Sequence, residues 1–529
     1  MQFRITWIVI VVAYCLAIQI VAAQPAATRF RVERYEVAGM NPLSAKATAK
    51  VLQNYLGEHE GLEGVQAAAD ALESSLRTAG HSFHRVILPP QTLQGGVVKF
   101  EVVEFVLGEI KIKDNRYFKE HNIRNSLRPL IKGQAPNTQK LSHALNFANQ
   151  HPAKQISLSF RESDQARAVD ASLEIKDRNP MSFFSALQNT GTEETGELRF
   201  TLGYQHTNLF NRDHNAAVVF TTSEESGTVQ QAGFSYRIPF YSHAGSVSIN
   251  YTNSDVESGQ IEDFFSISGK GSVTGLAYQY MIPGSSRYRH SISLSYDDKL
   301  FENVIEVDGQ EQVGSGSGDV RTSPISLTYA GTLSTLRTSF GYSATMVTNQ
   351  AGGSNSSSDD YQNIRDGADP DWTAVRYALN YDWRFVGKWM LRLRYLGQQA
   401  GEPLVPGEQF GLGGANSVRG YEERSVLGDN GWQFNTEIWA PAMLNDSLYT
   451  LLFVDTGEAE TEEFIDPTAI DTSDLNTNTT QEPSSVGIGV RWNWGETLAV
   501  KADFASVLET VGTTEDGDSF FHFSLFYRF

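Results

Sequence analysis

Residues 181–529 alternate apolar and polar side chains with a period of two, and this pattern constrains the fold more than any other feature of the chain. A period of two places successive side chains on opposite faces of a β-strand. The clearest segment has its apolar residues at Val375, Tyr377, Leu379, Tyr381, Trp383 and Phe385. Between them lie Arg376, Asn380, Asp382 and Arg384. Roughly sixteen such segments predict an extended antiparallel β-structure.

The two faces of these segments differ strongly in chemistry. The apolar face is rich in aromatic residues and the polar face is often charged, as expected for lipid outside and water inside; a soluble β-sandwich is the alternative. After residue 23 no segment approaches ~18 continuous apolar residues, so no membrane helix is predicted. A chain that crosses a membrane with strands must close its sheet, because only closure pairs every backbone group in lipid. We therefore predict a transmembrane antiparallel β-barrel of about 16 strands at residues 181–529.

The predicted connections alternate in length. Short turns are expected at residues 330–335, 386–387 and 495–496, and long loops at 300–321, 348–372, 399–430 and 457–484. In outer-membrane barrels the short turns face the periplasm and the long loops face outward. This parity places both ends of the barrel on the periplasmic side.

The first 23 residues predict a secretory signal peptide. Arg4 precedes an apolar run from Ile5 to Val21, and small residues end the segment at Ala23. An uncleaved membrane anchor is the alternative. The single cysteine, Cys15, lies in this segment, so the mature chain has no thiol for disulfide, zinc or nucleophilic chemistry. The formal charge of −20 argues against nucleic acid as a partner.

Residues 30–178 predict two small α/β domains. The first, residues 30–107, has a strand at 30–39, a helix capped by Ser44 that runs to Gly57, an amphipathic helix closed by Gly80, and two strands within 84–104. The second, residues 108–178, repeats the order of strand, helix, helix, strand, strand in divergent form. These units resemble periplasmic polypeptide-transport-associated (POTRA) domains, most specifically in LPPQTLQGGVVKFEVVE, residues 88–104. A generic pair of α/β domains is the alternative.

Two short motifs lie two predicted strands apart. GGANSVRGYEERS, residues 413–425, falls in the long loop after the eleventh strand, and Phe453-Val454-Asp455-Thr456-Gly457 falls on a later strand. Together they resemble two-partner-secretion transporters, the hemolysin activation/secretion family of POTRA-bearing barrels. The resemblance implies a loop tip that folds back into the barrel and is formed by Val418, Arg419, Gly420 and Tyr421. It also implies that Arg419 meets Asp455, with Phe453 and Gly457 framing the acid.

The residue types in these motifs suit that arrangement. Arginine presents a planar fork of donors that holds a carboxylate bidentately and keeps its charge. Gly420 permits a turn where a side chain would collide. The alternative is an exposed loop arginine worth at most ~1 kcal/mol to any surface partner.

The last strand, SFFHFSLFYRF, has aromatic and aliphatic residues at every second position. Phe523, Leu525, Tyr527 and Phe529 resemble the signal that delivers barrels to the outer-membrane assembly machinery. An ordinary closing strand would show the same pattern, and both interpretations can hold.

No catalytic or metal site is predicted. The chain shows no convincing set of nucleophile, base and orienting group, so we do not expect an enzyme, and no cofactor is implied. His81 and His84 lack a third ligand and are expected to be solvated. The acids at Asp366, Asp369 and Asp371 depart from the spacing of a calcium-binding EF-hand loop.

The resemblance implies an outer-membrane transporter that secretes a large partner protein of the adhesin or hemolysin type. Its expected partners are that protein, bound by the POTRA domains in the periplasm, the outer-membrane lipid and the barrel assembly machinery. An insertase that folds other barrels is the alternative, and a passive pore is a third. Family members often start with a plug helix, but only about six residues separate Ala23 from the first strand. We therefore expect the loop that carries Arg419 to occupy the lumen.

Overall fold

The computed structural model describes residues 29–191, 196–224, 230–254, 260–262, 265–266, 270–285, 287–303, 305–307, 310–312, 318–462 and 479–529. The predicted signal peptide, residues 1–23, lies outside the described residues. By its internal contacts the chain divides into two compact units. The first extends to Ile110 and includes Ile131–Lys140 and Phe160–Ala171. The second comprises Lys111–Leu130, Leu141–Ser159 and Ser172–Phe529.

The first unit contains an α/β domain built around a three-stranded sheet in the order β2–β5–β4. These strands are β2 (Arg34–Gly39), β5 (Val97–Glu104) and β4 (His84–Ile87). Its helical elements are α2 (Ala45–Leu52), the 3-10 turn η1 (Gln53–Tyr55) and α3 (Glu63–Thr78). The helix α3 buries Leu72 and Leu76 in the same hydrophobic core as Phe100 of the central strand. This packing follows from the three- and four-residue spacing of the apolar positions of α3.

Local sequence predicts most of this domain. Ser44 caps α2 by accepting a hydrogen bond from the Ala47 amide at 3.2 Å. The single strand predicted at residues 30–39 is wrong, because β1 (Arg29–Val32) pairs with β3 (Gly57–Glu60) whereas β2 pairs with β5. The strand β3 was not predicted, because its sequence, GEHE, has no apolar residue and its pairing comes entirely from β1.

The second α/β domain has the predicted order of elements. It comprises β6 (Val106–Lys113), α4 (Glu120–Ser126), α5 (Thr138–Ala148), β7 (Lys154–Glu162) and β8 (Ala168–Asp177). Its strands form a sheet in the order β6–β8–β7 and contribute segments to both units. Within the described residues, no helix combines the length and the hydropathy needed to cross a membrane.

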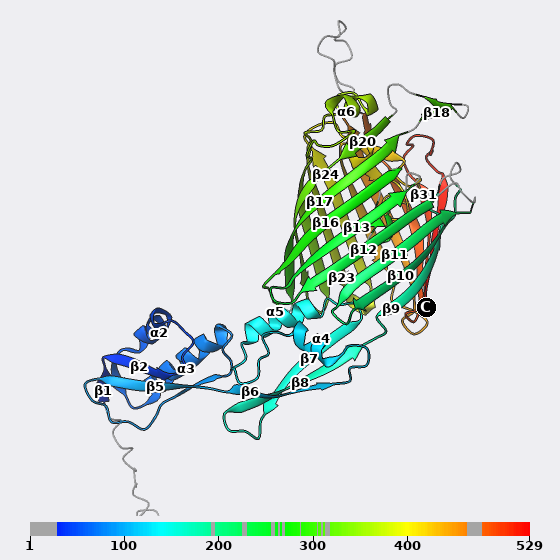
Figure 1. Ribbon diagram of the computed structural model, residues 1–529. Coiled ribbons are helices and arrows are strands. Elements are labelled where there is room, and N and C mark those ends of the chain that lie inside the picture. The colour runs from blue at the N-terminus through cyan, green and yellow to red at the C-terminus, as the bar shows by residue number, and fades with distance from the viewer. Residues whose placement is uncertain are drawn as a thin grey trace, which may run out of the picture. The chain divides into compact units, whose positions relative to one another are not determined.

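Sixteen long strands in the described part of the second unit close into one antiparallel barrel (Figure 1). They are β9 (Met181–Gln188), β10 (Arg199–Leu209), β11 (His214–Ser223), β12 (Gln230–Phe240), β13 (Gly245–Ser254), β16 (Gly271–Ile282), β17 (Tyr288–Asn303), β21 (Ile325–Ser334), β22 (Thr338–Thr348), β23 (Thr373–Arg384), β24 (Met390–Ala400), β27 (Asn430–Trp439), β28 (Leu448–Thr461), β30 (Ser484–Trp494), β31 (Leu498–Val507) and β32 (Ser519–Arg528). The barrel closes where β32 pairs with β9, with Ser524 opposite Gln188.

Shorter elements extend the strands or form the long connections. They are β14 (Gln260–Glu262), β15 (Phe265–Ser266), β18 (Ile305–Val307), β19 (Gln310–Gln312), β20 (Gly318–Thr322), α6 (Ser358–Ile364), η2 (Val386–Lys388), η3 (Pro406–Glu408), β25 (Phe410–Leu412), β26 (Val426–Gly428) and β29 (Thr479–Gln481). The helix α6 lies at the end of the barrel that carries the long loops (Figure 1).

The outward face of the barrel is apolar, as predicted from the alternation. On β23, Val375, Leu379 and Trp383 are each more than two-fifths exposed. The polar residues of the same strand point inward, where Arg376 contacts Gln398 of the neighbouring strand. Apolar side chains on the outside and polar side chains on the inside match a barrel that is surrounded by lipid and filled with water.

Short and long connections alternate around the barrel. The turns at 386–388 and 495–497 lie where the sequence predicts them. The turn predicted at residues 330–335 is wrong, because β21 continues to Ser334 and the chain reverses at 335–337. The β-branched residues of this segment favour strand, and Thr335 and Thr338 close the actual turn, with the Thr335 amide donating to the Thr338 carbonyl at 2.7 Å.

Candidate functional site in the barrel lumen

The loop between β24 and β27, residues 401–429, folds back into the barrel. Its short hairpin, β25 paired with β26, brings residues 413–425 to the inner faces of the last strands. Val418 and Tyr421 at the tip are fully buried. They belong to a hydrophobic cluster formed by Leu412, Val418, Tyr421, Val426, Ala459 and Val507. The tip therefore packs on β28 and β31 and is not a solvent-exposed loop end.

The structure brings Arg419 and Asp455 together. Arg419 Nε donates to Asp455 Oδ2 at 2.6 Å, and Nη2 donates to Asp455 Oδ1 at 2.8 Å. The two parallel hydrogen bonds form the bidentate geometry that planar guanidinium and carboxylate groups favour. The backbone amide of Arg419 also donates to Asp455 Oδ2 at 3.3 Å. Arg419 is 3% exposed and Asp455 is fully buried.

Asp455 has a third partner on the barrel wall. Asn435 of β27 donates from Nδ2 to Asp455 Oδ1 at 2.9 Å and to the Ser417 carbonyl at 2.7 Å. The same amide thus connects the acid on β28 to the backbone of the loop tip. Hydrogen bonds to a buried carboxylate offset part of the free-energy cost of removing it from water.

Sequence reasoning missed two further acids around Arg419. Its Nη1 lies 3.1 Å from Glu437 Oε1 and 3.6 Å from Asp503 Oδ1. Glu437 lies on β27 and Asp503 on β31, and both face the lumen. The alternation of Gln433, Asn435 and Glu437 marks an inward-facing polar row, but it does not show which member meets the loop.

Phe453 and Gly457 lie two residues before and after Asp455 on β28, and each is close to the lumen loop. The guanidinium of Arg419 lies over the Phe453 ring, with 3.5 Å between Cζ and the ring centroid, which is a cation–π geometry. A Cβ on Gly457 would lie 2.9 Å from the Trp432 carbonyl oxygen of β27 and 2.9 Å from Leu412 Cδ1 of the loop, so any larger residue would crowd both.

Gly420 and Tyr421 complete the tip. Gly420 has a φ of 100°, and its amide donates to His522 Nε2 on β32 at 3.0 Å. A Cβ at this position would lie 3.2 Å from Val507 Cγ2. The Tyr421 hydroxyl donates to the Glu509 carbonyl at 2.7 Å and accepts from the Ser484 amide at 3.1 Å. The four residues of the tip thus contact β28, β30, β31, β32 and the connection between β31 and β32.

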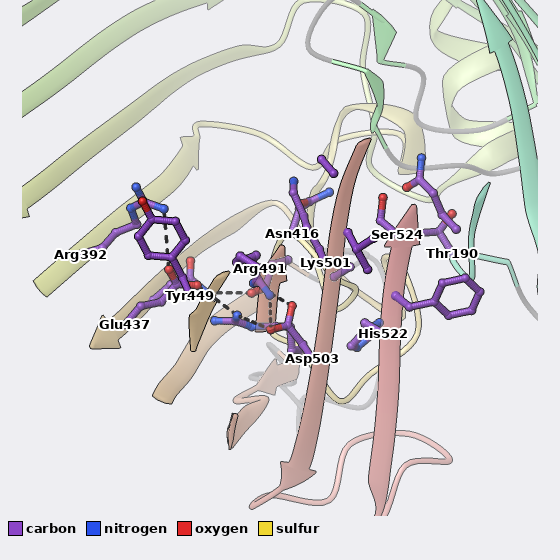
Figure 2. Close-up of a pocket in the computed structure, with 18 of the residues that line it drawn as sticks. Thr190, Arg392, Asn416, Glu437, Tyr449, Arg491, Lys501, Asp503, His522 and Ser524 are labelled. Carbon is purple, nitrogen blue, oxygen red and sulfur yellow. Dashed lines mark hydrogen bonds and ion pairs between the residues drawn. The ribbon is translucent and has the colours of Figure 1, made fainter. Parts of the chain in front are cut away.

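A polar cavity of about 290 Å³ lies beside Arg419 in the lumen. Figure 2 shows Arg491 and Asp503 next to each other in its lining, and their two hydrogen bonds measure 2.8 and 2.9 Å. Glu437 accepts from Trp439 Nε1 at 2.8 Å on the same wall. The lumen beside the loop is therefore lined by charges and has room for water.

A second buried polar cluster lies where α4 and β7 meet two short turns of the barrel. Lys154 donates from Nζ to Asp213 Oδ2 at 2.6 Å, to Asn122 Oδ1 at 2.7 Å and to Ser126 Oγ at 2.9 Å. Tyr241, from the next short turn, donates to the same carboxylate. Both charged side chains are fully buried. The sequence analysis did not identify this cluster.

Burial and charge act in opposite directions on the carboxyl of this cluster. Burial disfavours the charged form of Asp213 and is the largest single influence, but the Lys154 ammonium, His151 and the hydrogen bonds from Lys154 and Tyr241 together hold the pKa of Asp213 below its usual value. Burial lowers the pKa of nearby His151, whose Nε2 lies 2.7 Å from the Thr207 carbonyl. At neutral pH the cluster therefore contains an ionised aspartate and a neutral histidine.

The remaining sequence candidates lie apart from these two clusters. His84 is buried, contrary to the expectation that it is solvated, and its ring packs edge-on against His81. Among the described residues no group of three or more His, Cys, Asp or Glu could hold a metal ion. Asp369 accepts from the Asp371 amide at 3.0 Å and from the Ser358 hydroxyl at 2.9 Å, which stabilises its own loop.

The terminal strand presents its alternate residues to the outside. Leu525, Tyr527 and Phe529 are exposed, Phe529 most of all, and Phe523 is half-buried. Phe523, Leu525 and Tyr527 lie on the outward face of β32, which a membrane would cover, and Phe529 directly follows the strand.

Comparisons with known proteins agree with this architecture. Residues 169–468 match the family described as haemolysin secretion/activation protein ShlB/FhaC/HecB, and residues 30–104 match the ShlB-type POTRA domain. The heme/hemopexin transporter protein HuxB of Haemophilus influenzae strain 86-028NP is 21% identical over 425 residues, which cover 77% of this chain and 72% of HuxB. The outer membrane transporter CdiB-2 of Burkholderia pseudomallei strain 1026b is 23% identical over 148 residues, 28% of this chain and 25% of CdiB-2.

Two solved structures share the fold. CdiB from Escherichia coli superposes with a TM-score of 0.75 at 15% identity and covers 97% of this chain and 93% of its own. CdiB from Acinetobacter baumannii gives a TM-score of 0.69 at 16% identity, with coverage of 96% and 91%.

The α/β domains, the closed barrel and the lumen loop define an outer-membrane transporter with periplasmic POTRA domains. The family match spans more than half of the chain, so the chain belongs to the haemolysin secretion/activation family ShlB/FhaC/HecB, the two-partner-secretion transporters. The predicted family, fold class and location are confirmed. The short turns, and the Lys154 cluster with them, therefore face the periplasm, and the long loops face outward.

Proposed function

We propose that this transporter secretes one or a few large partner proteins of the adhesin or haemolysin type, without nucleotide or covalent chemistry and without a cofactor. In this proposal residues 1–23 are a cleaved signal, residues 30–107 and 108–178 are the POTRA domains, and residues 181–529 are the barrel. The observation that carries it is the loop tip held inside a polar lumen by side-chain contacts of Arg419. Such contacts can be exchanged for water or for a passing chain without breaking the backbone pairing of the barrel wall.

The partner docks first on the POTRA domains as an unfolded segment. Among the described residues, β2 pairs with a neighbour on one side only, because the sheet runs β2–β5–β4. An extended segment can add to such an edge, where main-chain hydrogen bonds give affinity and side-chain pockets give selectivity. The segment then passes through the barrel and folds outside, and that folding supplies the direction of transport.

Two experiments test this function. Loss of the transporter should remove one surface or secreted protein and leave the general outer-membrane profile intact, whereas a broad fall in barrel proteins would favour the assembly-factor alternative. Deletion of residues 30–107 should abolish export of the partner while leaving a heat-modifiable barrel in the outer membrane. Normal secretion by the truncated protein would refute docking on the first domain.

We also propose that Phe523, Leu525, Tyr527 and Phe529 serve as the barrel-assembly signal, with the assembly machinery and outer-membrane lipid as partners. The support is the position of the first three on the outward face of the last strand and the exposure of Phe529 directly after it. Phe529→Ala should reduce the amount of heat-modifiable barrel, and Phe521→Ala, on the same face, is the matched control. Equal yields from the two variants would show that Phe529 acts only as one more lipid-facing residue.

A further inference from the structure

The lumen loop contains a second buried carboxylate, Glu408, at the end of η3. Its side chain has no exposed surface. It accepts from Lys299 Nζ at 2.9 Å and from Arg376 Nη2 at 3.0 Å. The Thr322 hydroxyl donates to the same carboxylate at 2.7 Å. Three charge-assisted hydrogen bonds to one acid form a strong local contact.

The backbone of Glu408 is attached to the same part of the wall. Its carbonyl accepts from Gln398 Nε2 at 3.1 Å and from Arg376 Nη2 at 3.3 Å. The side chains of Arg376 and Gln398 also contact each other, with 2.7 Å between Nε and Oε1. Each charged side chain of this network, Glu408, Lys299 and Arg376, therefore has a partner of opposite charge. The network holds both the side chain and the main chain of Glu408.

The two carboxylate contacts of the loop lie on different parts of the barrel wall. The donors to Glu408 come from β17, β20, β23 and β24, whereas the acceptors of Arg419 come from β27, β28 and β31. In strand order these groups do not overlap. The loop is therefore fastened to one arc of the wall before its tip and to another arc at its tip.

We propose that Glu408 is a second positioning residue of the transporter, which holds the loop across the lumen independently of Arg419. In this arrangement the loop spans the lumen between two attachment points. Loss of the Arg419 contact alone frees the tip but leaves the segment at Glu408 attached to the wall. The inference rests on the proposed role of the loop in transport. Its test measures the loop itself and uses no secreted partner, so its failure and the failure of the proposed function are distinguishable.

Each contact should contribute separately to keeping the loop in place. Release of the whole loop requires both contacts to break, so removing either one multiplies the open population. The loss of hydrogen bonds to a charged group corresponds to about a ten- to a hundredfold change in an equilibrium constant. The double variant should show the product of the two single effects, because the contacts share no residue.

The experiment records openings of the purified full-length protein in planar lipid bilayers. Glu408→Gln keeps the shape of the side chain and removes its charge, and Arg419→Ala removes the contact at the tip. Glu422→Gln is the matched control, because it makes the same change at an exposed residue of the same loop. We expect more frequent large openings in both single variants, many more in the double variant, and none beyond the native level in Glu422→Gln.

A thiol bridge shows whether movement of the loop causes the openings. The only native cysteine is Cys15, so cysteines can be introduced in pairs. Ser417 Oγ lies 2.7 Å from Gln433 Oε1, and Ser417→Cys with Gln433→Cys joined by a short bifunctional thiol reagent fixes the tip to β27. This bridge should suppress the large openings of the double variant. Persistent large openings after bridging would refute the proposal that the loop, held at two points, closes the lumen.

Two results with the Glu408 variant would also refute the proposal. Glu408→Gln could behave like Glu422→Gln, or the double variant could equal Arg419→Ala; either outcome means that Glu408 does not hold the loop. If Glu408→Gln fails to give a heat-modifiable barrel, Arg376→Gln removes the donor from the wall and keeps the acid. The same rise in openings is then expected, and its absence refutes the proposal.

Discussion

Replacing Arg419 should harm the transporter more than replacing Asp455, because the two residues leave different numbers of charges behind. Arg419 faces Asp455, Glu437 and Asp503, at 2.6, 3.1 and 3.6 Å. Asp455 accepts side-chain hydrogen bonds from one cation, Arg419, and from the neutral amide of Asn435. Removal of the arginine leaves Asp455 without a cation, although Asp503 keeps Arg491, whereas removal of the aspartate leaves the arginine with two carboxylates.

The magnitudes follow from burial and from the partners that remain. Arg419→Ala leaves a fully buried Asp455 with two neutral donors, the Asn435 side chain and the backbone amide of residue 419, and an uncompensated buried charge costs about 3–5 kcal/mol. Asp455→Ala costs less, about 1.5–3 kcal/mol, because hydrogen bonds to a charged group are lost but Arg419 keeps Glu437. The double variant should be less harmful than the sum of the two, by at least about 1 kcal/mol.

The assay is the amount of secreted partner per folded transporter, across both single variants and the double. Arg337→Ala, an exposed arginine in a short turn, is the control for loss of an arginine side chain. Exchanging Arg419 and Asp455 should not restore secretion, because the exchanged acid would face Glu437 and Asp503. Strictly additive effects of the two single changes, or equal losses from both, would refute this account of the site.

Three other perturbations have defined outcomes. Lys154→Met leaves Asp213 buried without its cation, so the contact between α4 and the turn at 210–213 should weaken by about 3–5 kcal/mol; unchanged hydrogen exchange of that turn would contradict this. The pKa of His151 is lowered from 6.5, so its contribution to stability is complete above pH 6.5 and declines below it. The lowered pKa of Asp213 adds stability that is present above pH 3.8 and is lost as the pH falls through the folded-state pKa. Amide hydrogen exchange of the turn at 210–213 should therefore rise in two steps on acidification. Gly420→Ala should reduce secretion, because a residue at φ 100° is strained by about 1–3 kcal/mol and its Cβ meets Val507, whereas Gly495→Ala, with open space around it, should lose less.

The barrel could be predicted from sequence because its two faces meet different solvents. Lipid favours apolar residues and water favours polar residues, so the polarity of Leu379 and Asn380 alone predicts which face of the strand each occupies. The pairing of Arg419 with Asp455 was implied by a family resemblance carried on two motifs. Spacing alone would not have found it, because residues 36 positions apart in sequence meet only through the folded loop.

The other contacts depend on information that no local pattern holds. Glu408 follows Pro406 and Gly407 and looks like an ordinary acid in a turn. Its burial arises because the loop enters the barrel and meets Lys299, more than a hundred residues earlier. Lys154 begins a predicted strand and resembles any edge lysine, and it is buried only because the turn at Asp213 covers it. Burial of such charges follows from tertiary packing.

The distinction between backbone and side-chain contacts gives the transporter two kinds of stability. The barrel wall is held by continuous backbone pairing around its whole circumference, closed where β32 meets β9. The lumen loop is held by carboxylates, a buried tip and a short hairpin of its own. Ion pairs in a wet lumen can be replaced by hydration, but strand pairing in lipid cannot, because lipid offers no hydrogen bonds. A passing chain can therefore displace the loop while the wall stays closed. The contacts of Arg419 and Glu408 are then the ones whose strength sets how often the passage opens.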